Sequence, residues 1–278
     1  MRHPALRLLL AFVVAILVPA CGGSGDTFII PAASGPGSGS ILFVSSNNVL
    51  INVSATQPAV IISAVGLTNL PGATENIVGI DYRPATGELY GISSFNQLYR
   101  IFPLTGACVP VGPIGGLGLS GASFGIDFNP VVDRLRVVSE ANQNMRINST
   151  NAAVTVDTAL TYAVADPNFG ADPNVVAAAY TNNFAGALST TLYGIDSTLD
   201  ILVLQNPPNN GTLTTVGALG VDVSDFAGFD INASGTAYAA LEVAGVTGLY
   251  TINLTSGAAT LVGTLGTGGQ TRGMTAVP

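Results

Sequence analysis

The sequence predicts an all-β fold and, within that class, a β-propeller of five four-stranded blades. Two observations lead to this prediction. A unit of short apolar strands, separated by turns rich in Gly, Asn, Pro and Ser, recurs along the chain. The first copy of the unit lacks one strand, and a matching strand stands at the C-terminal end. A ring of blades, closed by pairing the two ends of the domain, explains both observations.

The clearest copy of the unit covers residues 78–112. Apolar Ile80 and Tyr82 alternate with smaller or polar neighbours, and further short apolar strands follow at 89–92, 98–101 and 109–111. The turns between them contain Thr-Gly pairs, which suit backbone positions with positive φ. This pattern of period two, broken by turn residues, is typical of antiparallel hairpins.

The starts of successive copies set the number of blades. Copies begin near Ile77, Ser123, Asn174 and Phe226, and these starts are 46, 51 and 52 residues apart. Four-stranded propeller blades span about 40–50 residues. The stretch 172–179 could open a short helix after Pro173, but its small and β-branched residues suit a strand equally well.

The ends of the domain complement each other. Residues 41–66 hold three strands, and residues 270–277 align with residues 76–82, which places Thr275 where Asp81 stands in the next copy. A C-terminal strand that pairs with the N-terminal blade, beside residues 41–46, would remove two exposed sheet edges. Antiparallel sandwiches and a β-helix are the competing folds, and the split first blade favours the propeller.

The N-terminal stretch predicts export and a lipid anchor. A basic flank precedes an apolar run at 8–18, which is too short to cross a bilayer, so residues 1–20 are interpreted as a signal peptide. Cys21 follows a small residue at the end of this run, as in a bacterial lipobox, and the resemblance implies cleavage before Cys21 and acylation of its thiol. Ordinary secretion with an incidental cysteine is the alternative.

Three segments follow from this interpretation. After the signal peptide, residues 21–40 are rich in Gly, Ser and Pro and are expected to form a flexible tether. Residues 41–278 are expected to form one propeller domain. The protein would then be attached to the bacterial envelope, at the outer membrane or the cell surface, through lipid alone.

The composition excludes several functions. The formal net charge is −8, and the chain has no lysine, so the clustered cations of a nucleic-acid-binding protein are missing. The only histidine, His3, lies in the predicted signal peptide, and there is no tryptophan. An exported chain therefore cannot build a Ser-His-Asp or Cys-His nucleophile system, a histidine-ligated zinc site or a lysine Schiff base. Cys108 has no partner for a disulfide within the domain and is expected to be a small buried apolar residue.

Three aspartates recur at matching points of the predicted first strands: Asp81, Asp127 and Asp230. First strands line the axis of a propeller, so these carboxylates could converge near one mouth of the channel. The functional interpretation is a calcium site, because hard cations prefer oxygen ligands, or an acid/base pair of the glycosidase kind. The structural interpretation is that each aspartate accepts hydrogen bonds from its own turn. Asp196 has a similar local motif, but its segment reads as a second strand.

The scarce arginines gather in two successive units, and four of them form a second candidate site: Arg83, Arg134, Arg136 and Arg146. One interpretation is an anion-binding rim, because the planar guanidinium suits carboxylate or phosphate. The other is ion pairing between blades, with Asp127, Asp133 or Glu140 as the acidic partner.

Several stretches resemble the family known as domain of unknown function 4394, which is found in exported bacterial proteins. The run from Asp127 to Arg136 is the most specific of them. The similar stretches cover most of residues 41–278 and are 47–50, 79–91, 128–137, 144–146, 179–183, 205–213 and 249–255. The resemblance implies a propeller-like fold and no assigned activity or catalytic residue.

Two functional hypotheses remain. The first is a monomeric, non-catalytic propeller, anchored in the envelope, that binds a protein or glycan or acts as a scaffold, without a cofactor other than calcium. The missing histidine and lysine favour it. The second is a glycan hydrolase or lyase that depends on carboxylates, which rests on analogy with other five-bladed propellers.

Overall fold

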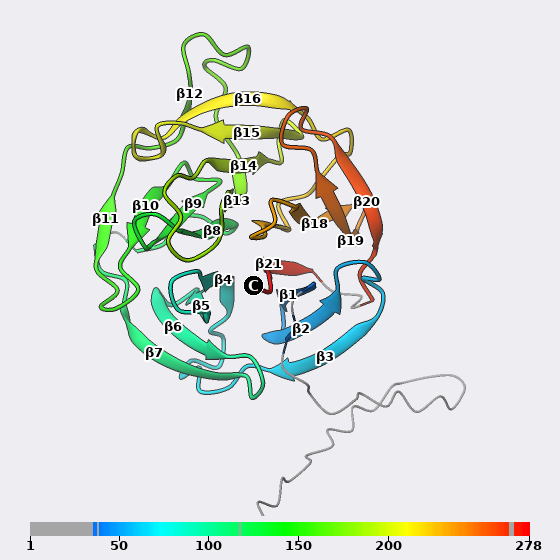
Figure 1. Cartoon of the computed structure of the whole chain (residues 1–278). Helices are drawn as coiled ribbons and strands as arrows, with labels where there is room; N and C mark the ends of the chain where they lie inside the picture. The colour runs from blue at the N-terminus through cyan, green and yellow to red at the C-terminus, as the bar shows by residue number, and fades with distance from the viewer. Residues whose placement is uncertain (1–35, 38, 117, 267–269) are drawn as a thin grey trace, which may run out of the picture.

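The computed structural model describes residues 36–37, 39–116, 118–266 and 270–278. Its strands form five sheets arranged in a ring about a central axis, and the strands pair antiparallel except for one short edge strand (Figure 1). The protein is therefore a five-bladed propeller, as the sequence predicts. Among the described residues, the only helical segment is the single 3-10 turn η1 (Pro208–Asn210). None of these residues belongs to a helix that is long and apolar enough to span a bilayer.

Each blade is a sheet whose strands follow one another from the axis outward, and we number the blades 1 to 5. Blade 1 contains β21 (Thr271–Ala276), β1 (Ser40–Ser45), β2 (Val49–Ser54) and β3 (Ile61–Gly66). Blade 2 contains β4 (Ile77–Arg83), β5 (Glu88–Ser93), β6 (Gln97–Phe102) and β7 (Ala107–Pro113). Blade 3 contains β8 (Phe124–Asn129), β9 (Arg134–Ser139), β10 (Asn144–Ile147) and β11 (Val154–Val156).

The other two blades follow the same order from the axis outward. Blade 4 contains β13 (Val175–Tyr180), β14 (Leu192–Asp196), β15 (Ile201–Gln205), β16 (Thr212–Ala218) and β12 (Thr161–Tyr162). Blade 5 contains β17 (Ala227–Ile231), β18 (Ala237–Val243), β19 (Val246–Ile252) and β20 (Ala259–Thr264).

The two ends of the domain meet in blade 1. Strand β21 pairs antiparallel with β1, with Thr275 opposite Leu42 and Met274 opposite Phe43. In Figure 1, red β21 lies beside blue β1 at the centre of the ring. The predicted closure is therefore confirmed: β1 is paired on both sides, by β21 and β2, and β21 is the inner strand of blade 1.

Blade 4 departs from the predicted four strands. The two-residue strand β12 pairs parallel to β16, with Thr161 opposite Thr212, and so adds a fifth strand at the outer edge. Sequence reasoning did not find it because two residues show no periodicity. The ambiguous stretch 172–179 is extended: it leads into the strand β13, and Asp196 lies on the second strand, β14, as expected.

The inner strands approach one another so closely that their glycines are required. A Cβ atom at Gly125 of β8 would lie 2.6 Å from the backbone carbon of Ala177 in β13. One at Gly273 of β21 would lie 2.8 Å from the Cα of Gly79 in β4. Real Cβ atoms are not found this close to backbone atoms, so a side chain here would force the blades apart. The repeated Gly-x-Asp motif thus combines close packing with a polar group two residues later.

The apolar core lies between the blades. Buried apolar side chains form five clusters, and each cluster joins two consecutive blades around the ring. Between blades 2 and 3, for example, the rings of Tyr90 and Phe128 pack edge to face with centroids 5.3 Å apart. Cys108 is buried between blades 1 and 2, as predicted, and it forms no disulfide among the residues that the structure describes. Burial raises the pKa of its thiol to about 11, so the reactive thiolate is scarce at neutral pH.

The predicted signal peptide (1–20), the anchor Cys21 and most of the predicted tether (21–40) lie outside the described residues. The described chain enters the propeller at Ser40, the first residue of β1, one residue before the predicted start of the domain.

Candidate axial carboxylate site

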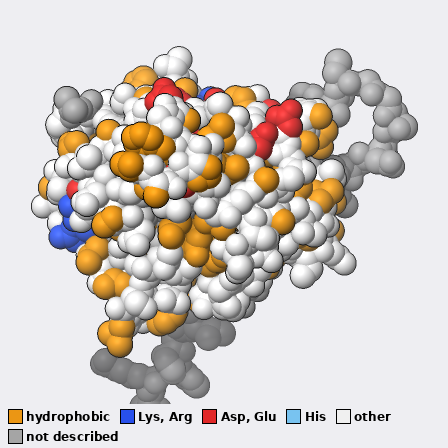
Figure 2. Space-filling view, turned by 90° about the horizontal axis from the view of Figure 1, so that it is seen from above, with side chains coloured by type: hydrophobic (Ala, Val, Ile, Leu, Met, Phe, Trp, Pro, Cys, Tyr) orange, Lys and Arg blue, Asp and Glu red, His pale blue; other side chains and the backbone are white. Residues whose placement is uncertain are grey.

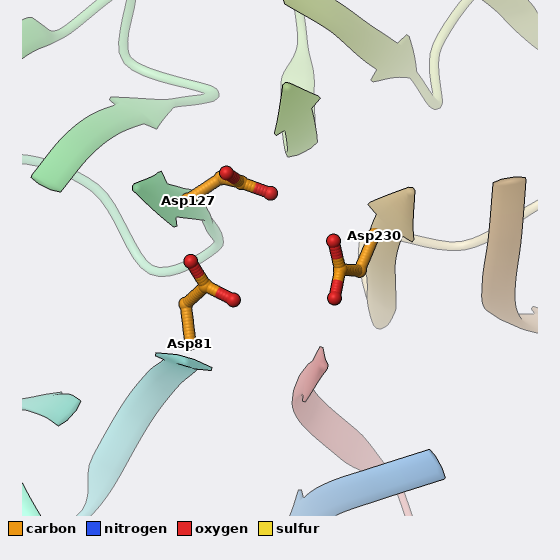
Figure 3. A group of neighbouring side chains, drawn as sticks. All are labelled: Asp81, Asp127 and Asp230. Atoms are coloured by element: carbon orange, nitrogen blue, oxygen red, sulfur yellow. The ribbon is translucent and has the colours of Figure 1, made fainter. Parts of the chain in front are cut away.

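The three repeated aspartates meet on the propeller axis. Asp81, Asp127 and Asp230 project from the inner strands β4, β8 and β17, and their side chains point toward one another (Figure 3). One carboxylate oxygen from each lies within 4.8 Å of those of the other two. All three residues are at most 1% exposed. The three aspartates therefore converge, as the sequence pattern predicts. They are sealed inside the ring and are not open at a mouth of the channel.

The other two blades have different residues at this level. In blade 1, Gly273-Met274-Thr275 replaces Gly-x-Asp, and the Thr275 hydroxyl oxygen lies 2.9 Å from Asp81 Oδ1 and 3.1 Å from Asp230 Oδ2. In blade 4, Ala177-Ala178-Ala179 stands at this level of the inner strand and brings no side-chain oxygen.

The aspartates and Thr275 connect neighbouring blades. The Phe128 amide of blade 3 donates to Asp81 Oδ2 of blade 2 at 2.7 Å, and the Ala276 amide of blade 1 donates to Asp230 Oδ2 of blade 5 at 2.7 Å. The Tyr82 amide donates to the Thr275 hydroxyl at 3.4 Å. The expectation that these side chains accept from their own turns is therefore wrong for Asp81 and Asp230.

Asp196 shows what such a turn aspartate looks like. Its Oδ1 accepts from the amides of Thr198 and Leu199, in the turn that directly follows β14, and its Oδ2 accepts from Tyr162 and Asn174. It has a full set of partners and takes no part in the axial group. The structural interpretation is thus correct for Asp196.

Asp127 differs from its two neighbours. It is fully buried, and within the described residues neither of its carboxylate oxygens has a hydrogen-bond partner. Burial raises its pKa well above the usual range, and the nearby Asp81 and Asp230 carboxylates raise it further. The backbone amide of Tyr180 in blade 4 faces the carboxylate and opposes this shift, but it does not reach hydrogen-bond geometry. A buried carboxylate without partners is unfavourable, so this position must be neutralised in some way.

The same forces act on the other two acids. Burial, followed by repulsion from Asp230, raises the pKa of Asp81 well above its usual range, against the opposing effect of the Phe128 amide. Burial also raises the pKa of Asp230, while the Ala276 amide and the Thr275 hydroxyl oppose the shift. Asn183, in the turn that follows β13, donates to Asp230 Oδ1 at 3.2 Å.

The space along the axis is small. A cavity of about 10 Å³ lies in the adjoining layer, lined by inner-strand glycines and by the apolar residues that directly precede the acids and Thr275, which are Ile80, Ile126, Phe229 and Met274. This volume is enough for about one water molecule. A second cavity, of about 20 Å³, lies where the inner strands begin, beside Asp225 and Arg272. The cavity beside the axial carboxylates can hold a water molecule, and a sugar does not fit in it.

The four arginines of the predicted anion rim separate into two groups. Arg83 of blade 2 forms a salt bridge across the blade boundary with Asp133, and its Nε lies 2.7 Å from Asp133 Oδ1. Arg134 donates to the backbone carbonyl of Asp133 at 2.9 Å. The hydrogen bonds from Arg83 hold the pKa of Asp133 below its usual range. This group has the pairing between blades that the alternative interpretation predicts.

The second group surrounds an acid that sequence reasoning missed. Arg136 and Arg146 both donate to Asp157 Oδ2, at 2.6 Å and 2.8 Å. Arg136 is 1% exposed, and it also donates to the side-chain oxygens of Tyr180, Asn144 and Asn209. Asp157 directly follows the short strand β11, and no spacing in the sequence connects it with these arginines. The only available signal was that scarce buried cations need acidic partners.

The comparisons with known proteins agree with this fold. A protein of unknown function from Bacteroides thetaiotaomicron has a TM-score of 0.53 at 14% identity over 82% of this chain, which spans 56% of that chain's length. A chain of the nidogen/laminin complex has a TM-score of 0.50 at 11% identity, covering 86% of this chain and 98% of the other. At such identities the likeness shows the fold alone. No curated protein matches the sequence. The family model described as Domain of unknown function (DUF4394) matches residues 49–275, so the chain belongs to this family.

Proposed function

We propose that this protein is a non-catalytic binding module of the bacterial envelope, held there by a lipid on Cys21. The observation that carries the proposal is the sealed state of the axial carboxylates. Glycoside hydrolysis needs two carboxyl groups about 5–9.5 Å apart on either side of a bound sugar. Here the acids are at most 1% exposed, beside a cavity of about 10 Å³. This geometry supports binding or scaffolding over the alternative of a glycan hydrolase or lyase.

One face of the ring offers an apolar surface for a partner. The inner strands run in the same direction, so the turns that follow β8 and β13 lie on one face of the propeller. Val131 and Val132 in the first turn, and Phe184 and Leu188 in the second, are exposed, with Leu188 at 96%. We name these four side chains the exit-face patch. Groups of exposed apolar side chains on one face mark surfaces that bind other proteins, so the partner that fits best is a protein.

The rest of the visible surface is compatible with such a role. Figure 2 views the molecule from the top of Figure 1 and shows mainly uncharged surface, with hydrophobic side chains in several groups and few charged ones. The Gly/Ser/Pro composition of residues 21–40 supports a tether that leaves the propeller free to turn toward its partner.

The lipid anchor is tested by fractionation and mass spectrometry. The wild-type protein should sediment with membranes and carry an acylated N-terminal cysteine at position 21. Cys21→Ser should remove the acyl group and the membrane association, because serine lacks the thiol that carries the proposed lipid. Cys108→Ala is the matched control, since this other cysteine is buried in the propeller. A Cys21→Ser variant that stays with the membranes would contradict the anchor.

The binding face is tested by crosslinking in intact cells, followed by affinity purification. The wild type should capture a defined envelope protein, and serine substitutions at Val131, Val132, Phe184 and Leu188 should abolish the capture. Val246→Ser and Leu261→Ser are matched controls, because both residues are more than half exposed but lie on blade 5, outside the exit-face patch. Equal capture by the patch variant, or no specific partner for the wild type, would contradict the proposal.

A further inference from the structure

We propose that Asp81, Asp127 and Asp230 bind one calcium ion on the propeller axis and that this ion holds the blades together. The donor set consists of carboxylate oxygens, with the Thr275 hydroxyl beside them. Hard cations such as calcium prefer such oxygens, whereas zinc and copper sites in proteins are built mainly from histidine and cysteine. The site is additional to the exit-face patch and does not depend on the proposed binding function.

The spacing of the acids suits calcium. Ca–O distances in proteins are about 2.3–2.6 Å. Three oxygens that lie within 4.8 Å of one another leave a point between them that is at most about 2.8 Å from each, so shifts of a few tenths of an ångström would bring all three into contact with one ion. Figure 3 shows the three carboxylates turned toward a common centre. Magnesium binds at about 2.0–2.1 Å in a strict octahedron and retains several waters, for which the small axial space leaves little room.

The unpartnered carboxylate of Asp127 points to a ligand independently of the clustering. Asp81 and Asp230 each accept a backbone amide and lie beside Thr275, so the fold itself accounts for their positions. Asp127 is fully buried, is aimed into the group, and has no hydrogen-bond partner for either oxygen among the described residues. A bound cation would give both oxygens the partner that they lack among the described residues.

The charge balance leads to the same conclusion. Among the described residues, none of the three acids forms a salt bridge. The Thr275 hydroxyl has a single proton, so it cannot donate to both Asp81 and Asp230 at once. Either protons or a cation must therefore neutralise the group. A single divalent ion would balance most of the charge, and the adjoining cavity of about 10 Å³ could hold a water ligand.

An ion at this point would tie distant parts of the chain together. The three carboxylates come from blades 2, 3 and 5, and Thr275 comes from the closing strand of blade 1. The ligands would thus hold the C-terminal strand against β4 and β17. Because unfolding separates the ligands, calcium should stabilise the folded ring by mass action.

The test begins with the purified mature protein, freed of loosely bound ions by dialysis. Elemental analysis should find about one calcium per chain. Treatment with a chelator should then lower the unfolding temperature, and added calcium should restore it, with a shift of about 5–10 °C at a concentration 100-fold above the dissociation constant. A metal-free protein whose unfolding temperature responds to no calcium would show that protons neutralise the acids, and it would overturn the proposal.

Asp127→Asn separates the two ways of neutralising the site. The substitution keeps the shape of the side chain and breaks no hydrogen bond in the described residues. With an ion site, the variant should lose the bound calcium and the calcium-dependent shift, while in chelator it should be at least as stable as the wild type. Asp222→Asn, on an exposed loop, should change neither property. Calcium binding by Asp127→Asn that equals that of the wild type would contradict the assignment of Asp127 as a ligand.

Discussion

Blade 3 contains two buried aspartates with opposite surroundings. The Asp157 side chain lies at the outer edge of the blade, is 6% exposed and accepts hydrogen bonds from two arginines. Asp127 is fully buried at the inner edge and has no partner among the described residues. The same sheet can therefore provide cations for a buried carboxylate, and it does so at only one of the two positions. Where the chain leaves the charge uncompensated, the carboxylates of three blades meet.

Arg136 makes this difference sharper. It is directly opposite Asp127 in the register of β8 and β9, so it is the nearest arginine along the sheet. Its guanidinium nevertheless donates to Asp157, Asn144, Asn209 and Tyr180. The arginine is thus held away from the axis by four polar partners. We infer that blade 3 combines a structural ion pair at its outer edge with an open acidic position at its centre.

The largest effect is expected when the outer pair is broken. Asp157→Ala would leave the buried Arg136 guanidinium without its acidic partner and would also release Arg146. Removing one member of a buried ion pair costs about 3–5 kcal/mol. Urea unfolding at pH 7 should show a loss of this size. Asp222→Ala, on an exposed loop, serves as the control and should change the unfolding free energy by less than about 0.5 kcal/mol. A loss below about 1 kcal/mol for Asp157→Ala would mean that the pair adds little.

A smaller loss is expected when the close approach at the axis is disturbed. Gly125→Ala would place a Cβ atom 2.6 Å from the backbone of β13, which cannot move as a flexible side chain could. Overpacking of this kind costs about 1–3 kcal/mol. Gly66→Ala is the matched control, because no atom lies within 4 Å of the added Cβ in β3. Thermal unfolding of both variants measures the difference, and equal stabilities would show that the inner strands can separate without cost.

The fold was predictable because the residues that recur in each unit are those that the backbone of an inner strand requires. Gly-x-Asp marks the inner strands, since glycine allows close approach at Gly125 and the carboxylates of Asp81 and Asp230 accept the amide of the next blade. The same alignment placed Thr275 correctly and so predicted the closure of the ring. Strand β12 was missed because its two residues are recognised only by their pairing with β16.

The candidate site was predictable in its members but not in its contacts. The repeat identified the three aspartates, because equivalent positions of inner strands must face the same axis. It could not show that Asp127 would lack a partner, since that depends on where Arg136 points. For the arginines, the sequence suggested Asp133, which the structure pairs with Arg83. It did not suggest Asp157, because side-chain direction in an irregular segment leaves no periodic signal.

The smallest effect is expected at the partly exposed pair of Arg83 and Asp133, and it should depend on pH. The Asp133 pKa in the folded protein is below its usual value because Arg83 donates to the carboxylate. The pair therefore stabilises the fold above the unfolded-state pKa of about 3.9, and this contribution is lost as the pH falls through the lower folded-state value. Asp133 also has a positive φ of 53°, a conformation that asparagine tolerates, so Asp133→Asn leaves the backbone undisturbed.

Asp133→Asn should therefore lower the unfolding free energy by about 0.5–1 kcal/mol at pH 7, the range of partly exposed ion pairs. The difference from the wild type should begin to shrink as the pH falls below about 3.9 and should vanish once the pH is below the lowered folded-state pKa of Asp133, where the carboxylate is protonated in both states. Urea unfolding at pH 7, 5 and 3 measures this decline. A difference that is the same at every pH would mean that Asp133 acts through its shape alone, and the contrast between paired and unpaired acids would then rest on Asp157.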